Sequence, residues 1–271
     1  MLKSINQWVF PAGMPPEKAL SLAAEAGFQA FEVCLGEDGP TSITASEEDL
    51  DGLRRHADRF GLELSSVATG LGWQYPLTSP DPRVRDKGKE CIERTARAAH
   101  VLGADAALVV PGVVDAGTSY DEAIERAIDA IQDLLPLAEQ LQVCLAIENV
   151  WNKFLLSPVE MRDFIDQFES PCIGAYADVG NLLVQGYPEQ WLRILGRRVR
   201  KVHMKDFKLS IGNINGFVML LEGDVDWPAV MAALRAIGYQ GPLTAEYGPY
   251  AHGVETTLRH LSAALDAILA L

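Results

Sequence analysis

The sequence contains few cysteines and few histidines, with four of the first and five of the second among 271 residues. The cysteines lie far apart, and no pair has the C-x-x-C spacing of a zinc knuckle or a redox motif. Free thiols in a reducing compartment are therefore expected. No apolar run reaches the roughly 18–20 residues that span a bilayer, and the first residues lack the features of a signal peptide. We therefore expect a cytoplasmic protein.

Basic residues are also scarce relative to acidic ones. Lys and Arg total 23 against 37 Asp and Glu, which gives a net charge of −14. Such a field repels phosphodiester backbones and argues against nucleic acid as the main partner, whereas a small anionic substrate would be bound by local basic groups. A hydrophobic content of 48% excludes extensive disorder. We therefore expect a globular protein that acts on a small molecule.

Short apolar runs alternate with longer amphipathic segments along the chain. We expect strands at residues 4–10, 30–36, 64–70, 104–111, 143–150, 173–179, 199–206 and 242–247. Segments 119–141 and 254–269 repeat apolar residues every three to four positions, which is typical of amphipathic helices. Four expected helices end in a glycine just before a strand, namely Gly27, Gly61, Gly103 and Gly238.

The spacing of these strands predicts the fold. Strand starts recur at intervals of about 34 residues, the length of one strand–helix unit. Eight such units predict an α/β fold, a (β/α)₈ TIM barrel, with residues 1–271 forming one domain. An open doubly wound sheet is the alternative, but it would carry a Gly-rich turn after the first strand, and this sequence has none there.

Polar residues interrupt the apolar runs near the ends of the last four expected strands. These residues are Glu148, Asp178, His203 and Glu246. Each alone has an ordinary structural explanation as a cap, an ion-pair partner or a core histidine. In a barrel, however, the strand ends meet at one mouth, and three carboxylates with an imidazole require a cation between them. We expect one divalent metal ion, with Mn²⁺ favoured over Mg²⁺, Co²⁺ or Zn²⁺.

The residues around these four positions resemble a known family. The stretches ENVWNKF (148–154), DVGN (178–181), VHMKDF (202–207) and EGDVDW (222–227) are similar to those of the sugar phosphate isomerase/epimerase superfamily, which has a xylose isomerase-like TIM barrel. The nearest branch contains the L-xylulose-5-phosphate 3-epimerases and hexulose-6-phosphate isomerases. The resemblance implies that the four residues hold one metal ion and that Glu148 and Glu246 exchange protons with the substrate.

One departure from related enzymes affects substrate choice. Free-ketohexose 3-epimerases carry a histidine and an arginine where this chain has Asn181 and Leu209. The forms Asp-x-Gly-Asn and His-x-Lys-Asp are closer to the phosphosugar and inosose-type branches.

The chemistry of epimerisation requires the same groups. A C–H proton next to a carbonyl is weakly acidic, and a metal-stabilised enediolate makes its removal feasible. A carboxylate on each face, Glu148 and Glu246, would remove and return the proton. We therefore expect a metal-dependent sugar isomerase or epimerase acting on a ketose or ketose phosphate.

Three other functions are considered. A dehydratase of a ketoinositol or related polyol, a lyase, is the main alternative, because it begins with the same proton abstraction. An apurinic-site endonuclease is disfavoured by the acidic charge and by histidines 56, 100 and 260, which fall in expected helices. A non-catalytic binding protein would have no need of both glutamates.

Further residues near the strand ends are candidates for substrate binding, namely Asn181, Lys205, Trp151, Glu32 and Trp73. The tryptophans would either stack on a sugar or pack the barrel rim. Glu32 would point either into the mouth or into an ion pair.

Polar residues after the seventh strand complete the expectations. Lys205 or Lys208 would bind a phosphate, and Asp206 would orient His203. Association through helix faces into a homo-oligomer is also considered.

Overall fold

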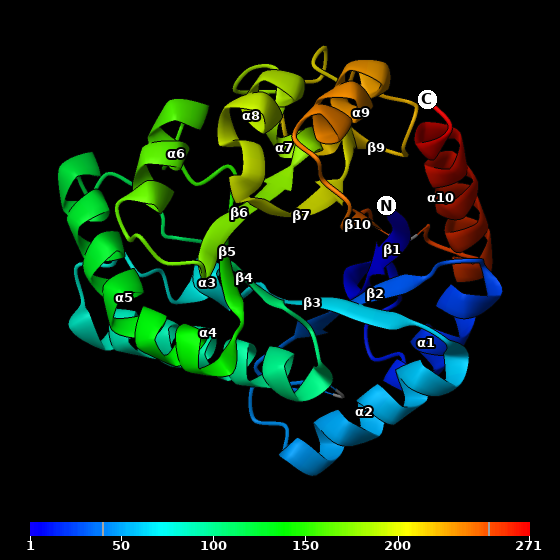
Figure 1. Cartoon of the computed structure of the whole chain (residues 1–271), viewed down its shortest axis with the longest axis horizontal. Coiled ribbons are helices and arrows are strands. Elements are labelled where there is room, and N and C mark those ends of the chain that lie inside the picture. The colour runs from blue at the N-terminus through cyan, green and yellow to red at the C-terminus, as the bar shows by residue number, and fades with distance from the viewer. Residues whose placement is uncertain (40, 249) are drawn as a thin grey trace.

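The chain forms a closed barrel of parallel strands surrounded by helices (Figure 1). This computed structural model describes residues 1–39, 41–248 and 250–271. Within them the barrel order is β1 (Leu2–Asn6), β10 (Pro242–Ala245), β7 (Val199–Met204), β6 (Ile173–Asp178), β5 (Cys144–Glu148), β4 (Ala106–Val109), β3 (Glu63–Thr69) and β2 (Ala30–Leu35). Each expected strand overlaps one of these eight, so the predicted (β/α)₈ TIM barrel is confirmed.

Helices follow the strands and cover the outside of the barrel (Figure 1). The longer ones are α1 (Pro16–Glu25), α2 (Glu47–Phe60), α4 (Pro82–Leu102), α5 (Tyr120–Leu141), α6 (Pro158–Asp166), α8 (Pro188–Leu195), α9 (Trp227–Ala236) and α10 (Val254–Leu269). Two single-turn helices, α3 (Leu71–Gln74) and α7 (Val179–Leu182), lie directly after β3 and β6. No helix of the described residues has the length and apolar character needed to cross a membrane.

Local sequence signals explain where the helices begin and end. Ser46 caps α2 through a reciprocal capping box with Asp49, and Ser157 caps α6. The cap of α4 is Asp81, not the expected Ser79, because its carboxylate accepts from the Arg83 N–H. The four glycines expected to end helices have φ values of 69–84°, namely Gly27, Gly61, Gly103 and Gly238. A left-handed residue at that position lets the chain leave the helix toward the next strand.

The barrel has two apolar regions of different character. Large side chains fill the layer between strands and helices. The inward-facing apolar residues are mostly small and include Cys34, Ala68, Ala106, Cys144 and Ala146. Their small volume leaves room inside the barrel for polar side chains and for the ring of Tyr176.

Two expected strands are longer than the observed ones. The first ends at Asn6, because the Asn6 Oδ1 accepts from the Trp8 N–H and starts a 3₁₀ turn over Gln7–Val9. The seventh ends at Met204. Beyond it, β8 (Asp206–Phe207) pairs antiparallel with β9 (Phe217–Val218) and forms a small flap beside the barrel mouth.

Candidate active site

The four polar residues expected at the strand ends come together at the barrel mouth. Glu148 and Asp178 end β5 and β6, His203 lies in β7, and Glu246 follows β10 directly. The sheet register places Asp178 beside His203, and His203 beside Thr244. Because side chains two residues apart share a face, Glu246 points inward as Thr244 does. One potential ligand atom from each of the four lies within 4.8 Å of the others.

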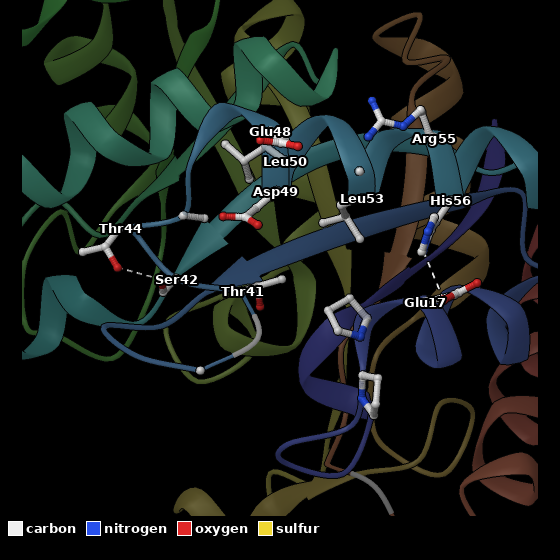
Figure 2. A pocket seen from close by; sticks show the side chains of 15 residues that line it. Glu17, Thr41, Ser42, Thr44, Glu48, Asp49, Leu50, Leu53, Arg55 and His56 are labelled. Atoms are coloured by element: carbon white, nitrogen blue, oxygen red, sulfur yellow. Dashed lines mark hydrogen bonds and ion pairs between the residues drawn. The ribbon is translucent and has the colours of Figure 1, made fainter.

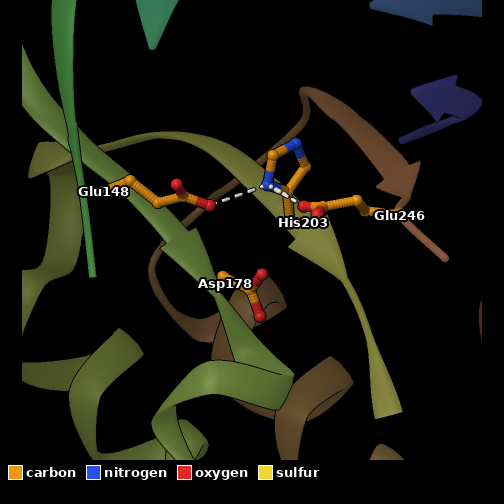
Figure 3. A group of neighbouring side chains, drawn as sticks. All are labelled: Glu148, Asp178, His203 and Glu246. Atoms are coloured by element: carbon orange, nitrogen blue, oxygen red, sulfur yellow. Dashed lines mark hydrogen bonds and ion pairs between the residues drawn. The ribbon is translucent and has the colours of Figure 1, made fainter. Parts of the chain in front are cut away.

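His203 lies at the centre of this cluster, with Glu148 and Glu246 on either side of its ring (Figure 3). The Nδ1 atom is 3.0 Å from Glu148 Oε1 and 3.0 Å from Glu246 Oε2. Asp178 lies on a third side, where Lys205 Nζ is 2.9 Å from its Oδ2 and 2.8 Å from Glu246 Oε1. Three carboxylates thus converge on one imidazole and one ammonium group.

Burial and like charges raise two of the carboxyl pKa values. Burial raises the pKa of Glu148 to about 7, and the charges of Glu246 and Asp178 act in the same direction. Burial also raises the pKa of Asp178. For Glu246 the charges of Lys205 and His203 outweigh burial and hold the pKa well below its usual range. The cluster therefore holds more negative charge than its own cations neutralise, which favours a bound cation.

The donor set fits a divalent metal ion. Asp178 Oδ2 is buried and accepts no hydrogen bond, although Lys205 Nζ lies 2.9 Å away, because the approach angle is unsuitable. A buried carboxylate oxygen without a hydrogen bond is a common sign of a missing ion. Three carboxylates and one imidazole nitrogen suit Mn²⁺ or Mg²⁺. Ligation by these four residues stays a prediction.

A pocket of about 380 Å³ opens above the cluster. Glu148, Glu246 and Lys205 form part of its lining, with an aromatic and apolar wall contributed by Trp8, Trp73, Val150, Trp151, Ile214 and Phe217. An adjoining hollow of about 460 Å³ shares Trp8, Lys205 and Glu246 with it and adds Tyr247. Apolar ring faces beside a few converging polar groups are typical of sites for sugars and other small molecules.

The residues expected to bind substrate divide into two groups. Asn181, Lys205, Trp151 and Trp73 line the pocket. Trp151 also packs the rim, because its ring stacks on Phe217 with centroids 5.0 Å apart and its Nε1 donates to the Asn181 carbonyl. Asn181 donates to the Asn149 carbonyl, which fixes its side chain at the wall.

Glu32 lies below the cluster and not in the pocket. Its side chain is fully buried inside the barrel, and its Oε1 is 2.7 Å from His203 Nε2. Of the two roles left open by the sequence, the structure shows the ion pair. Burial raises the pKa of Glu32, but the contact with His203 outweighs it and leaves that pKa below its usual value.

The expectation that Asp206 orients His203 is wrong. The Asp206 carboxylate instead accepts from the backbone N–H groups of Phe207, Leu221, Gly223 and Val225 and from Trp227 Nε1. It therefore anchors the segment that returns from the β8–β9 flap to α9. Lys208 is not among the residues that line the pocket, so Lys205 is the lysine that turns into the mouth.

Three residues at the site were not selected from the sequence, namely Trp8, Phe217 and Tyr176. Trp8 follows the first strand, as the candidate ligands follow later ones, and that placement was a usable signal. Tyr176 precedes Asp178 by two residues and so shares its face of β6. Phe217 reaches the mouth through the β8–β9 pairing, which no local pattern indicates.

A larger groove lies outside the barrel, between α1 and α2 (Figure 2). It measures about 820 Å³, and Glu17, Thr41, Glu48, Arg55 and His56 are among its lining residues. Glu17 Oε2 lies 3.5 Å from His56 Nδ1 across it. The groove contains none of the four clustered residues among its described lining, so the candidate site is the barrel mouth.

Comparison with known proteins gives related sequences that extend over most of the chain. L-ribulose-5-phosphate 3-epimerase UlaE of Salmonella heidelberg is 26% identical over 245 residues, which cover 89% of this chain and 85% of that protein. A putative L-ribulose-5-phosphate 3-epimerase, SgbU of Haemophilus influenzae, is 23% identical over 249 residues, covering 89% and 87%.

Solved structures show the same fold at lower identity. D-psicose 3-epimerase with D-tagatose from Clostridium cellulolyticum superimposes with a TM-score of 0.82 at 18% identity, covering 100% of this chain and 99% of that one. An L-ribulose 3-epimerase gives a TM-score of 0.83 at 18% identity, covering 99% and 94%. The family model described as xylose isomerase-like TIM barrel matches residues 20–264. With this match and the barrel itself, the chain belongs to the xylose isomerase-like TIM barrel family.

Proposed function

We propose that this protein is an isomerase that epimerises or isomerises a ketose or ketose phosphate with the help of one divalent metal ion. The observation that carries the proposal is the cluster of Glu148, Asp178, His203 and Glu246 at the floor of an aromatic-lined pocket. The related proteins named as 3-epimerases of L-ribulose 5-phosphate support the same class of reaction.

The two pocket glutamates are positioned to move a proton. Glu148 and Glu246 come from strands on opposite flanks of the cluster, and both line the pocket. A ketose placed between them would present one face of its reacting carbon to each carboxylate. One glutamate would then remove the C–H proton next to the carbonyl, and the other would deliver a proton to the opposite face.

The rest of the site would support this transfer. A bound divalent ion would supply Lewis-acid chemistry by drawing electron density from the sugar oxygens. Asp178 and His203 would hold that ion together with the two glutamates. Lys205 would keep Asp178 and Glu246 in place through its two ion pairs. Trp8, Trp73 and Trp151 would cover the sugar and reduce its contact with water.

Hydrogen exchange tests the proposal directly. The protein, loaded with Mn²⁺, is incubated in deuterated water with a panel of ketoses and ketose 5- and 6-phosphates. We expect one of them to gain deuterium at a carbon next to the carbonyl and to accumulate as its epimer or isomer. Exchange accompanied by loss of water would identify the dehydratase alternative instead. Absence of exchange across the panel would contradict the proposal.

A further inference from the structure

A buried carboxylate lies directly beneath the candidate metal site. Glu32 has no exposed surface, and four side chains from four other strands or strand ends contact it. Asn6 Nδ2 is 2.5 Å and His203 Nε2 is 2.7 Å from its Oε1. Ser66 Oγ is 2.7 Å and the Tyr176 hydroxyl is 2.6 Å from its Oε2. Both oxygens of Glu32 are therefore fully used within the barrel.

The direction of these hydrogen bonds follows from the partners. Asn6 Oδ1 accepts from the Trp8 N–H at 2.6 Å, which fixes the amide orientation so that Nδ2 faces Glu32. The Asn6 Nδ2 atom can only donate, so Glu32 Oε1 is an acceptor. The same oxygen faces His203 Nε2, and that ring nitrogen must therefore carry a proton. The other ring nitrogen, Nδ1, is the one that faces Glu148 and Glu246.

We propose that Glu32 is a positioning residue that keeps a proton on His203 Nε2 and thereby presents His203 Nδ1 to the metal ion. The inference rests on the proposed role of His203 as a ligand. It assigns to a residue outside the pocket the orientation and tautomer of the single imidazole in the cluster. A histidine ligand whose second nitrogen donates to a carboxylate is held in one orientation and binds metal more strongly.

Tyr176 provides a matched control for this role. Its hydroxyl donates to Glu32 Oε2, on the opposite side of the carboxylate from His203, and its ring lies 4.2 Å from the His203 ring between centroids. Tyr176→Phe keeps that ring packing and removes one hydrogen bond to Glu32. Glu32→Gln nearly preserves volume but removes the charge that faces Nε2. Both variants change the same buried network, and only the second acts directly on the contact with His203.

Two measurements without turnover test the inference. The dissociation constant for Mn²⁺ is measured by competition with a chelating indicator for the parent, Glu32→Gln, Tyr176→Phe and His203→Ala. We expect Glu32→Gln to weaken binding about ten- to a hundredfold and Tyr176→Phe to weaken it less. In parallel, nitrogen NMR of the ¹⁵N-histidine-labelled parent, loaded with diamagnetic Mg²⁺, should show the His203 ring proton on Nε2.

The outcomes separate this inference from the proposed function. If His203→Ala binds Mn²⁺ as tightly as the parent, ligation by His203 fails, and the inference fails with it. If His203→Ala loses the ion while Glu32→Gln keeps the parental affinity, the inference is overturned and the metal site stands. Should Glu32→Gln not fold, the NMR of the parent decides, since a proton on Nδ1 would overturn the inference by itself.

Discussion

Glu148 and Glu246 have the same side chain but different surroundings. Burial raises the pKa of Glu148 to about 7, whereas Lys205 and His203 hold the pKa of Glu246 well below its usual range. We expect Glu148→Gln and Glu246→Gln each to lower kcat at least about a hundredfold at saturating Mn²⁺, because each removes one proton-transfer group. Exchange of substrate hydrogen with deuterated water measures the effect. Glu47→Gln, on the exposed face of α2, is the control.

Either glutamate would be excluded as a proton-transfer group if its glutamine variant exchanged hydrogen at the parental rate. Circular dichroism of both variants should match the parent, since glutamine nearly preserves the volume of glutamate.

Lys205 has two anionic partners at the site, and this changes its expected role. Its Nζ lies between Asp178 and Glu246, so the charge first considered for phosphate binding is shared with two carboxylates. We expect Lys205→Met to lower kcat/KM by a similar factor on a ketose and on its phosphate ester. A loss confined to the phosphate ester would show instead that Lys205 binds phosphate. Lys208→Met, outside the pocket lining, is the matched control.

The candidate site could be predicted from the sequence where its residues follow a local rule. Glu148, Asp178 and Glu246 each end an apolar run, and strand ends in a barrel converge. The partners of Glu32 could not be predicted, because Tyr176 lies 144 positions away and only the closed barrel brings the two together. Asp206 was misassigned because its neighbour in sequence, His203, is not its neighbour in space.

Among the structural elements, the segment between β9 and α9 depends on one carboxylate. Asp206 accepts hydrogen bonds from four backbone N–H groups and from the Trp227 indole. A side chain at Gly223 would place its Cβ 2.1 Å from Asp206 Oδ1, which explains the glycine of the EGDVDW stretch. The flap that carries Phe217 to the pocket is therefore held by this contact.

We expect Asp206→Asn to lower the free energy of unfolding by about 2 kcal/mol, because the new amide leaves at least one buried N–H group without an acceptor. Urea unfolding followed by circular dichroism measures this. Asp224→Asn is the control, since Asp224 is exposed and accepts only from the Leu209 N–H. Equal stability of the two variants would show that Asp206 does not anchor the segment.

The sequence predicts the elements well where the pattern is local and long. The helix expected at 254–269 has the observed bounds of α10, because its apolar residues keep one spacing throughout. Strand ends were less accurate. Residues 7–9 continue the apolar pattern of the first strand, yet the Asn6 side chain turns them into a 3₁₀ helix. A side-chain cap of this kind overrides alternation without changing it.

For the whole molecule, we propose that residues 1–271 form one domain. The first and last barrel strands pair with each other, from Leu2 with Pro242 to Ile5 with Ala245. Lys3 Nζ also lies 2.8 Å from Asp266 Oδ1 of α10. The ring of strands is thus complete only when both ends of the chain are in place.

A metal ion that binds residues from β5, β6, β7 and the end of β10 would connect half of the barrel. We expect Mn²⁺ at a hundred times its dissociation constant to raise the free energy of unfolding by about 2.7 kcal/mol. For a chain of this size the melting temperature should rise by about 5 °C or more. Circular dichroism melts after chelator treatment, with and without added Mn²⁺, measure the shift. The same shift in His203→Ala would contradict the assignment.

The tryptophans are unevenly placed in the molecule. Of the five in the chain, Trp8, Trp73 and Trp151 line the pocket, whereas Trp191 and Trp227 are buried elsewhere. The pocket therefore contains its own optical reporter. A sugar that displaces water from the three pocket indoles should shift the fluorescence of the protein to shorter wavelength, over a constant signal from the other two. Ligand binding can then be titrated without labels, and Trp73→Phe should reduce the amplitude of the shift while leaving the constant signal in place.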